Sequence, residues 1–332
     1  MNQLGTLTSS IGPQIARYIA FKRALGGKAV ATAYILRRLD RFLTSTNGGD
    51  LTREAFSAWS ISLEHLHPSS RSHWLWAVYR FCIFRRREDP EGFVPDPVQF
   101  PSQGPRHLPY IFSEDEITRL LAAANSLDPH KASPLHREVA RIGIILLYTA
   151  GLRRGELARL TLGDYEAAEH ALFVHRSKFE KSRLVPLSSD AACELDRYLA
   201  VRKKVGAPSD RGTMLLVHNH GERFRGYTGE GLGILLRKVI RRTGIRTSQG
   251  RSPRVHDLRF TFAAHALLRW YRAGIDVQAR LPALATYLGH VSIVSTEYYL
   301  TFLKATAEAA SERFHLHSEP WLFLSGQGGD RP

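Results

Sequence analysis

Residues 149–157 read TAGLRRGEL, and they mark a junction between two predicted helices. The preceding residues, 137–148, are largely apolar and predict a helix that is central in its domain, and Gly151 ends that helix. Arg153 follows at the junction, and Glu156 comes three residues later, where it is close to the guanidinium group.

Cationic, imidazole and phenol side chains recur along the chain after this junction. They are Lys178 in a predicted turn (177–183) between short strands at 171–174 and 184–187, His256 and Arg259 three apart on one helix face, His290 after a helix-ending glycine, and Tyr299 nine residues later. Each of these motifs is weak alone. Their joint presence in one chain is specific.

The sequence predicts a mainly α fold with a small β-sheet (α+β). Hydrophobic residues recur at helical spacing in four segments of 13–88, which predicts a helical N-terminal domain over residues 1–89. Five prolines between residues 90 and 105 predict a linker over 90–108. A second domain is expected over 109–318, followed by a disordered tail, 319–332.

The second domain is predicted to begin with a capping box formed by Ser113 and Glu116. Further helices are predicted near residues 191–204, 231–242, 256–272, 277–288, 292–300 and 305–314.

Composition narrows the class of protein. The chain has 332 residues, 43% of them hydrophobic, which is enough for two domains with buried cores. Lys and Arg total 46 against 31 acidic residues, a formal net charge of +15 that favours a nucleic-acid partner. The apolar runs are too short to span a bilayer, and residues 1–10 lack a signal-peptide pattern. We therefore expect a cytoplasmic, nucleoid-associated protein with no membrane partner.

Metal and cofactor chemistry are not expected. Two distant cysteines, Cys82 and Cys193, exclude a disulfide framework and a cysteine-rich zinc site. The chain also lacks a glycine-rich phosphate loop, a dinucleotide fingerprint and a zinc-protease motif.

The second domain resembles the catalytic domain of the tyrosine recombinases, the phage integrase family. The family signature is Arg, Lys, His-x-x-Arg, His or Trp, and Tyr, in that order. All elements occur here in order and at similar spacing: Arg153, Lys178, His256, Arg259, His290 and Tyr299. The first domain resembles the family's helical core-binding domain, which has a SAM-like fold, so the resemblance covers residues from about 12 to about 315.

The resemblance implies an enzyme that breaks and rejoins DNA without metal or nucleotide. Tyr299 would attack phosphorus and form a 3′-phosphotyrosyl bond, which conserves the energy of the broken bond. Arg153 and Arg259 would hold the non-bridging phosphate oxygens in planar, permanently charged forks. Lys178 would protonate the leaving 5′-oxygen.

Three further residues complete the implied site. His256 would exchange the tyrosine proton as general base and acid, since an ordinary histidine pKa near 6.5 suits both directions. His290 would hydrogen-bond the transition-state phosphate. Glu156 would orient Arg153 rather than react.

Neighbouring residues of the same type compete for some of these roles: Arg154 with Arg153, Tyr298 with Tyr299, and Lys181 and Arg183 with Lys178. The Gly-Leu-Arg register of the family favours Arg153. The nine-residue spacing from His290 favours Tyr299, because Tyr298 lies about 100° away around a helix.

Arginines of the first domain are candidates for contacts with double-stranded DNA, although a basic helix face can also be merely solvated. The candidates are Arg37, Arg38, Arg41, Arg71, Arg85, Arg86 and Arg87.

Three functions are compatible with these residues. The first is a site-specific recombinase or integrase that assembles four protomers on two DNA sites, as a homo-oligomer or with related recombinases, and passes through a Holliday junction. The second is a type IB topoisomerase, which uses the same chemistry on one duplex. The third is a catalytically silent DNA-binding subunit of a recombinase complex.

A final apolar stripe follows Tyr299. Its members are Leu303, Ala307, Ala310 and Phe314. The stripe is at helical spacing and predicts a helix that docks either on a neighbouring protomer or on its own domain.

Overall fold

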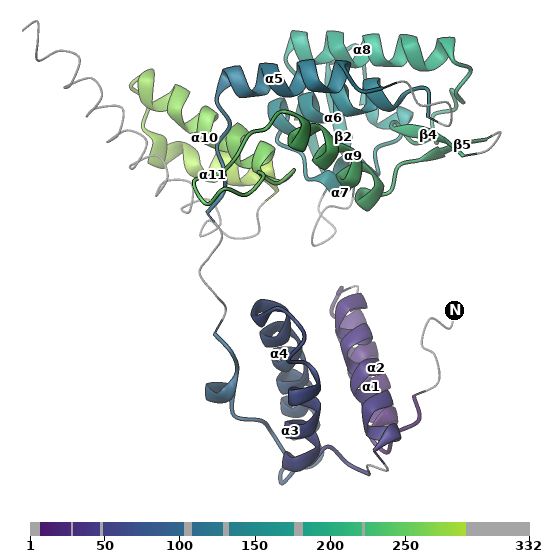
Figure 1. Cartoon of the computed structure of the whole chain (residues 1–332), viewed down its shortest axis with the longest axis vertical. Coiled ribbons are helices and arrows are strands. Elements are labelled where there is room, and N and C mark those ends of the chain that lie inside the picture. Colours follow the sequence, from purple (N-terminus) through teal and green to yellow (C-terminus); the bar gives the residue numbers. More distant parts are fainter. Residues whose placement is uncertain are drawn as a thin grey trace, which may run out of the picture. The chain divides into compact units, whose positions relative to one another are not determined.

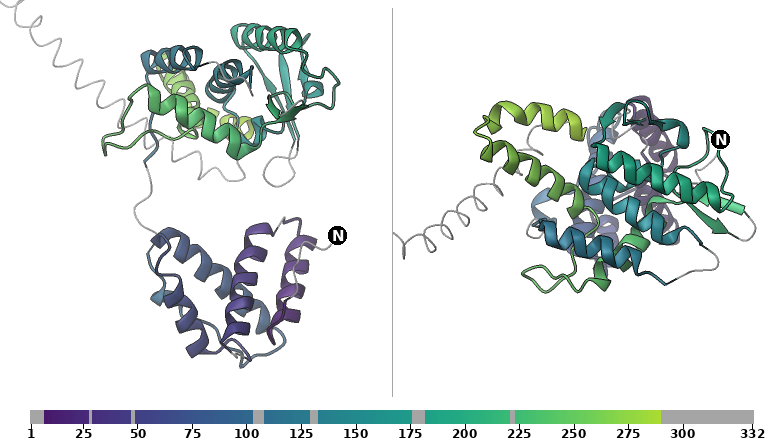
Figure 2. Two further views of the ribbon diagram at one scale, coloured as in Figure 1. Left: turned by 45° about the vertical axis from the view of Figure 1, so that its right-hand side comes forward. Right: turned by 90° about the horizontal axis from the view of Figure 1, so that it is seen from above.

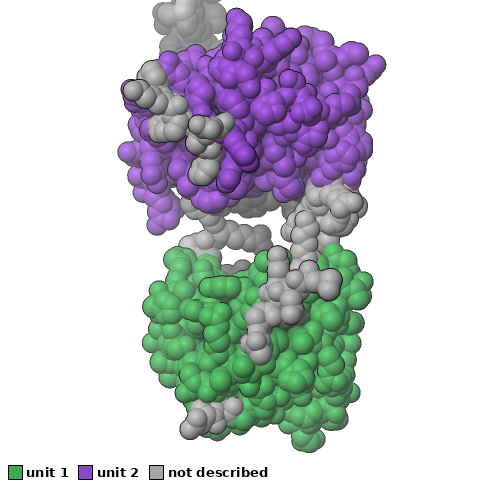
Figure 3. Space-filling model, turned by 90° about the vertical axis from the view of Figure 1, so that its right-hand side faces the viewer, with its two compact units in different colours: residues 1–108 green, residues 109–332 purple. Residues whose placement is uncertain are grey.

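The structure is a computed structural model, and it describes residues 7–27, 29–46, 49–102, 108–128, 133–175, 182–220 and 223–289. The chain divides into two compact units, Met1–Leu108 and Pro109–Pro332 (Figure 3). Each unit has its own hydrophobic core. No helix among the described residues is long and apolar enough to cross a membrane.

Four helices make up most of the first unit (Figure 1). They are α1 (Gly12–Ala24), α2 (Val30–Ser45), α3 (Arg53–Ser62) and α4 (Pro68–Arg85). The Thr52 hydroxyl accepts a hydrogen bond from the backbone N–H of Ala55 and so caps α3, while Pro68 occupies the first turn of α4. Their buried faces share a core that includes Leu39, Trp59 and Phe81. The four helices predicted between residues 13 and 88 are confirmed.

The first core extends beyond the predicted boundary at residue 89. Phe93 and Phe100 flank a short 3-10 helix, η1 (Pro97–Gln99), and their ring centroids lie 5.8 and 6.2 Å from that of Phe56. Phe100 also meets Trp76 edge-on at 5.5 Å. The linker was therefore predicted to begin too early, because aromatic residues between the prolines pack on the first core.

The second unit contains seven α-helices within its described residues. They are α5 (Glu114–Asn125), α6 (His136–Thr149), α7 (Arg154–Leu157), α8 (Ser189–Lys204), α9 (Gly229–Arg242), α10 (Asp257–Arg272) and α11 (Val277–Leu288). The capping box at the start of α5 is confirmed, since Ser113 and Glu116 each accept the other's backbone N–H. The helices predicted near 292–300 and 305–314, and the tail, lie outside the described residues.

Two small antiparallel sheets accompany these helices. The first has the order β1 (Tyr165–Glu166), β2 (Ala171–Val174), β3 (Arg183–Pro186), with Val174 opposite Arg183. The second pairs β4 (Val217–His220) with β5 (Arg223–Gly226) and was not predicted, because these strands are mostly polar and carry little hydrophobic alternation. The predicted α+β class is confirmed.

Helix α6 is central in the second unit and packs against α5, α8, α9 and α10, as its apolar sequence predicted (Figure 2). Gly151 follows it with a φ of +57°, and a Cβ atom there would lie 2.5 Å from the Phe262 ring. Only glycine combines this backbone conformation with so close an approach to α10. The resulting turn places Arg153 beside the C-terminal end of α11.

Candidate active site

Arg153 lies at the N-terminus of α7 and is held at three points. Its backbone N–H donates to Oε2 of Glu156 at 3.0 Å, and Nη1 donates to Oε1 at 2.6 Å. Nη2 donates to the backbone carbonyl of Gly289 at 2.8 Å. The side chain remains one-quarter exposed, so the guanidinium is oriented by protein groups and is still accessible to a ligand.

The Glu156 carboxylate is shared by arginines from three segments. Besides Arg153, Arg183 of β3 donates from Nη2 to Oε2 at 2.8 Å and from Nη1 to Oε1 at 3.2 Å. Nη1 of Arg259 lies 4.0 Å from Oε2. Burial alone would raise the pKa of Glu156, but hydrogen bonds from Arg183 and Arg153 outweigh it and lower that pKa to about 2. Glu156 is therefore ionised and hydrogen-bonded to the Arg153 guanidinium.

Arg259, in the first turn of α10, is almost completely buried. Its two terminal nitrogens donate to the backbone carbonyls of Gly151 and Leu288. Together with Arg153, it therefore binds the carbonyl-bearing C-terminal end of α11, where the helix dipole places partial negative charge.

His256 immediately precedes α10 and reaches solvent from the wall of a groove. Its ring meets Phe260 edge-on at 5.1 Å. Crowding by protein atoms, and then the charges of Arg259 and Arg254, lower the pKa of His256 to about 4. The imidazole is therefore neutral at pH 7 and able to accept a proton, which differs from the unshifted pKa expected from sequence.

The groove that contains Arg153 and His256 is strongly cationic. It has a volume of about 530 Å³, and the charged or titratable residues that line it are Arg153, Arg154, Arg237, Arg241, Arg254 and His256. Arg154 and Arg237 both contact Glu230, at 3.4 and 2.6 Å. A chain of guanidinium groups in a concave surface suits a polyanion better than a single small anion.

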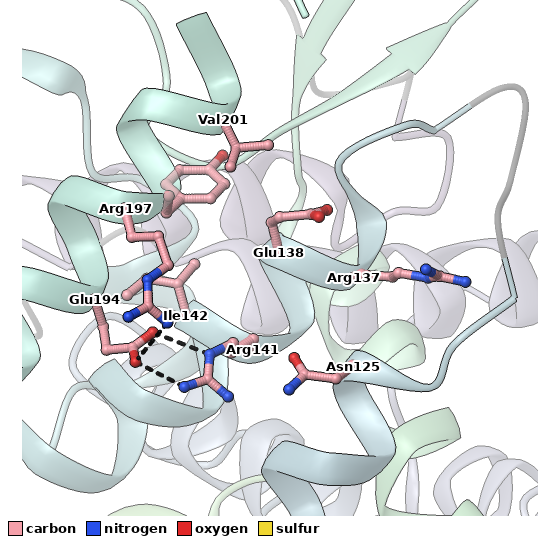
Figure 4. Close-up of a pocket in the computed structure, with 9 residues that line it drawn as sticks. Asn125, Arg137, Glu138, Arg141, Ile142, Glu194, Arg197 and Val201 are labelled. Atoms are coloured by element: carbon pink, nitrogen blue, oxygen red, sulfur yellow. Dashed lines mark hydrogen bonds and ion pairs between the residues drawn. The ribbon is translucent and has the colours of Figure 1, made fainter. Parts of the chain in front are cut away.

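A second pocket, of about 350 Å³, lies between α5, α6 and α8 (Figure 4). Arg141 and Glu194 form a two-pronged ion pair there, with distances of 3.0 and 2.7 Å, and Arg197 bonds to the same carboxylate. None of the described signature residues lines this pocket. It is therefore separate from the candidate active site.

The arginines proposed for DNA contact in the first unit differ in exposure. Arg38, Arg41, Arg86 and Arg87 are exposed, whereas Arg37 and Arg71 are half-buried. The choice of Arg85 was wrong. Its side chain is 4% exposed and forms a 2.7 Å ion pair with Asp50, because this position of α4 faces the core rather than solvent.

Several predicted site residues cannot be placed. Lys178 and its rival Lys181, His290, and the tyrosines Tyr298 and Tyr299 lie outside the described residues. The structure brings together Arg153, Glu156 and Arg259, and it places His256 in the same groove as Arg153. The other rival of Lys178, Arg183, is bound to Glu156.

The sequence did not point to the groove arginines of α9, or to Arg183 as a second partner of Glu156 besides Arg153. Arg237 and Arg241 are four residues apart on α9, a spacing that marks one helix face and could have been recognised. The contact of Arg183 with Glu156 spans 27 residues between a strand and a helix, so no local pattern predicts it.

A family model described as the phage integrase family matches residues 111–305, which is more than half of the chain. The chain belongs to the phage integrase family. The matched region contains every described residue of the candidate active site. The resemblance inferred from the signature residues is therefore confirmed.

Proteins with similar sequences include y4rB of Sinorhizobium fredii, which is named as an integrase/recombinase. It is 32% identical over 294 residues, which cover 88% of this chain and 93% of that protein. The tyrosine recombinase XerD of Listeria monocytogenes is 28% identical over 220 residues, covering 66% of each chain.

Solved structures show the same fold. The Tn1549 transposon integrase in complex with transposon right end DNA superposes with a TM-score of 0.62 at 17% identity, covering 90% of this chain and 98% of that chain. The XerH site-specific recombinase bound to a palindromic difH substrate also gives a TM-score of 0.62, at 18% identity, covering 91% of this chain and 84% of that chain.

Proposed function

We propose that the protein is a site-specific DNA recombinase of the integrase type, which cleaves and rejoins DNA through a 3′-phosphotyrosyl intermediate. The observation that carries the proposal is the Arg153–Glu156–Arg259 arrangement beside a cationic groove, in a chain of the phage integrase family. Similar proteins named as recombinases, and similar folds solved with DNA, support it.

The scissile phosphate would bind where Arg153 is accessible. Arg153 keeps one-quarter of its side chain exposed and is already oriented, so it can donate two parallel hydrogen bonds without a large loss of conformational entropy. Arg259 would take the second oxygen after exchanging its bond to the Leu288 carbonyl for one to phosphate. Both arginines would then stabilise the charge that develops on phosphorus in the transition state.

Proton transfer would involve His256 and Lys178. A neutral His256 can take the proton of the attacking Tyr299, and the nearby phosphate charge would raise the histidine pKa as the proton moves. Lys178 would give a proton to the leaving 5′-oxygen, and His290 would hydrogen-bond the phosphate. Rejoining reverses these steps with the 5′-hydroxyl of another strand as nucleophile, so no nucleotide cofactor is consumed.

The groove arginines would hold the DNA backbone next to the cleaved phosphate. Arg154, Arg237 and Arg241 lie beside Arg153 along the groove wall, and exposed Arg38, Arg41, Arg86 and Arg87 would add contacts from the first unit. Recombination then needs four protomers on two DNA sites, which exchange strands through a Holliday junction, in the cytoplasm where the chromosome lies.

A covalent-capture assay tests this function. Nicked duplexes of random sequence lose a short fragment on cleavage and leave the enzyme trapped on the DNA. In EDTA and without nucleotide, the wild-type protein should form covalent complexes, and sequencing of the captured ends should yield one site. Tyr299→Phe should bind the selected site and form no complex.

Other outcomes identify the alternatives. Binding without covalent capture by the wild-type protein would indicate a silent DNA-binding subunit. Capture at many unrelated sequences, together with relaxation of supercoiled plasmid, would indicate a topoisomerase. Cleavage that stops in EDTA and returns with magnesium would contradict the tyrosine mechanism.

A further inference from the structure

Glu156 is a buried carboxylate surrounded by more positive charge than it can neutralise. Its side chain is 2% exposed, and guanidinium groups of Arg153, Arg183 and Arg259 lie within 2.6 to 4.0 Å of its oxygens. Three positive charges and one negative charge leave a net charge of about +2 for the cluster. How Glu156 divides its hydrogen bonds therefore determines how much charge Arg153 can offer to a phosphate.

Of the three arginines, Arg183 makes the most side-chain hydrogen bonds to that carboxylate. It bonds to both oxygens, at 2.8 and 3.2 Å, and its side chain is 11% exposed, whereas Arg153 bonds by side chain to one oxygen only and is 25% exposed. A two-pronged pair of this kind is the strongest arrangement of arginine and carboxylate. Arg183 is therefore held against Glu156 and is mostly buried, which separates it from the role considered for it in place of Lys178.

The backbone at the end of α11 is shaped to admit both guanidinium groups. Gly289 has a φ of +65°, and a Cβ atom there would lie 3.2 Å from Nη1 of Arg183 and 3.5 Å from Nη1 of Arg153. Arg183 thus sits at the point where β3, α7 and α11 converge. Its loss would free Glu156 to pair more fully with Arg153.

We propose that Arg183 is a positioning residue for the strand cleavage proposed above: it neutralises and holds Glu156 so that Arg153 keeps its charge and its orientation for the scissile phosphate. The inference rests on the proposed function. Without Arg183, the carboxylate neutralises the accessible arginine and the net charge of the cluster falls from about +2 to about +1. The developing charge on phosphorus is then less well stabilised.

The test compares cleavage of a phosphodiester with cleavage of a methylphosphonate at the same scissile position. The methyl group replaces one charged non-bridging oxygen, so a methylphosphonate depends less on the arginine clamp. Arg183→Met should slow covalent complex formation by about 100-fold or more on the phosphodiester, and by a much smaller factor on the methylphosphonate. DNA affinity and thermal stability are measured alongside.

Two further variants isolate charge from shape. Arg183→Met combined with Glu156→Gln removes both buried charges and returns the net charge of the cluster to about +2. This double variant should therefore cleave the phosphodiester at least about tenfold faster than Arg183→Met alone. Arg183→Lys keeps the charge without the fork and should show a smaller defect than Arg183→Met. If Arg183→Met does not fold, the Lys and double variants still give the substrate comparison.

Equal losses on the two substrates in a folded variant, or no recovery in the double variant, would overturn the assignment of Arg183. Failure of the proposed function gives a different result. In that case the wild-type protein does not cleave either substrate, or Tyr299→Phe cleaves as well as wild type.

Discussion

Nη2 of Arg153 donates a 2.8 Å hydrogen bond to the backbone carbonyl of Gly289, 136 residues further along the chain. The residue after Gly289 is His290, so Arg153, the more accessible of the two signature arginines, is bonded to the backbone that carries the next signature residue. Arg259 makes the corresponding bond to Leu288. The position of α11 and the orientation of both arginines are therefore coupled in this protein.

The first prediction separates Arg153 from its neighbour Arg154. Arg153→Lys keeps a positive charge but lacks the planar fork whose two terminal nitrogens reach Glu156 and Gly289, and it cannot bind a phosphate bidentately, so cleavage of the captured site should slow by about 100- to 1000-fold. Arg154→Lys should lose only a small part of the rate, because Arg154 meets exposed Glu230 at 3.4 Å. The measurement is the rate of covalent complex formation at saturating protein. A larger loss of rate for Arg154→Lys than for Arg153→Lys would mean that Arg154, not Arg153, binds the scissile phosphate.

The second prediction concerns Glu230, which forms ion pairs with two groove arginines, Arg154 and Arg237. Glu230→Gln should tighten DNA binding and steepen its dependence on salt, because two guanidinium groups become available to phosphates. Glu194→Gln is the matched control, since it removes the same charge in the separate α6–α8 pocket. Affinities at three or more salt concentrations give the slopes. A wild-type log–log slope shallower than about −3 would contradict an extensive phosphate contact.

The third prediction is a pH dependence of stability due to His256. Its pKa of about 4 in the folded protein is below the ordinary value of 6.5. Between these two values the unfolded chain binds a proton that the folded site rejects, so stability falls as pH falls from about 6.5 to about 4. Urea unfolding at several pH values should show this loss in wild type and less of it in His256→Gln.

Glu156 provides an internal check on that pH series. Its folded pKa is about 2, below the ordinary 4.5, so its contribution is present above pH 4.5 and is lost only at lower pH. An identical loss in wild type and His256→Gln between pH 6.5 and 4.5 would show that His256 is not the group responsible.

The fourth prediction tests the turn that carries Arg153. Gly151→Ala and Gly206→Ala both place a methyl group at positive φ, +57° and +74°, but only at residue 151 would it collide with a neighbour, 2.5 Å from Phe262. Both variants should pay the backbone cost of about 1–2 kcal/mol, and Gly151→Ala should lose about 1–3 kcal/mol more through overpacking. Chemical denaturation gives the comparison. Equal losses would mean that α10 moves aside at no cost.

Local patterns account for the parts of the fold that sequence predicts well. The capping box at Ser113, the apolar run of α6 and the glycine at residue 151 each act within a few residues, so their outcomes are visible in the sequence. The β4–β5 hairpin was missed because its polar residues do not alternate with apolar ones. Arg85 was misassigned because a basic run at a helix end does not reveal which member turns inward to meet Asp50.

The residues of the candidate site also divide into those that local patterns predict and those that depend on long-range contacts. Arg153, Glu156, His256 and Arg259 were found from short motifs, whose spacing is set within one turn of helix. The pairing of Arg183 with Glu156, the burial of Arg259 and the lowered pKa of His256 depend on segments brought together by folding. Long-range contacts of this kind leave no periodic signal in a single sequence.

The most direct measurement of the central claim is the identity of the residue that becomes attached to DNA. The wild-type protein trapped on its nicked site in EDTA is digested with nuclease and trypsin, and the modified peptide is sequenced by tandem mass spectrometry. Cleavage after Arg280 and Lys304 yields a peptide, 281–304, that contains Tyr287, Tyr298 and Tyr299. We expect a nucleotide attached through phosphate to Tyr299 alone. Attachment to Tyr287 or Tyr298, or captured DNA with no modified tyrosine, would contradict it.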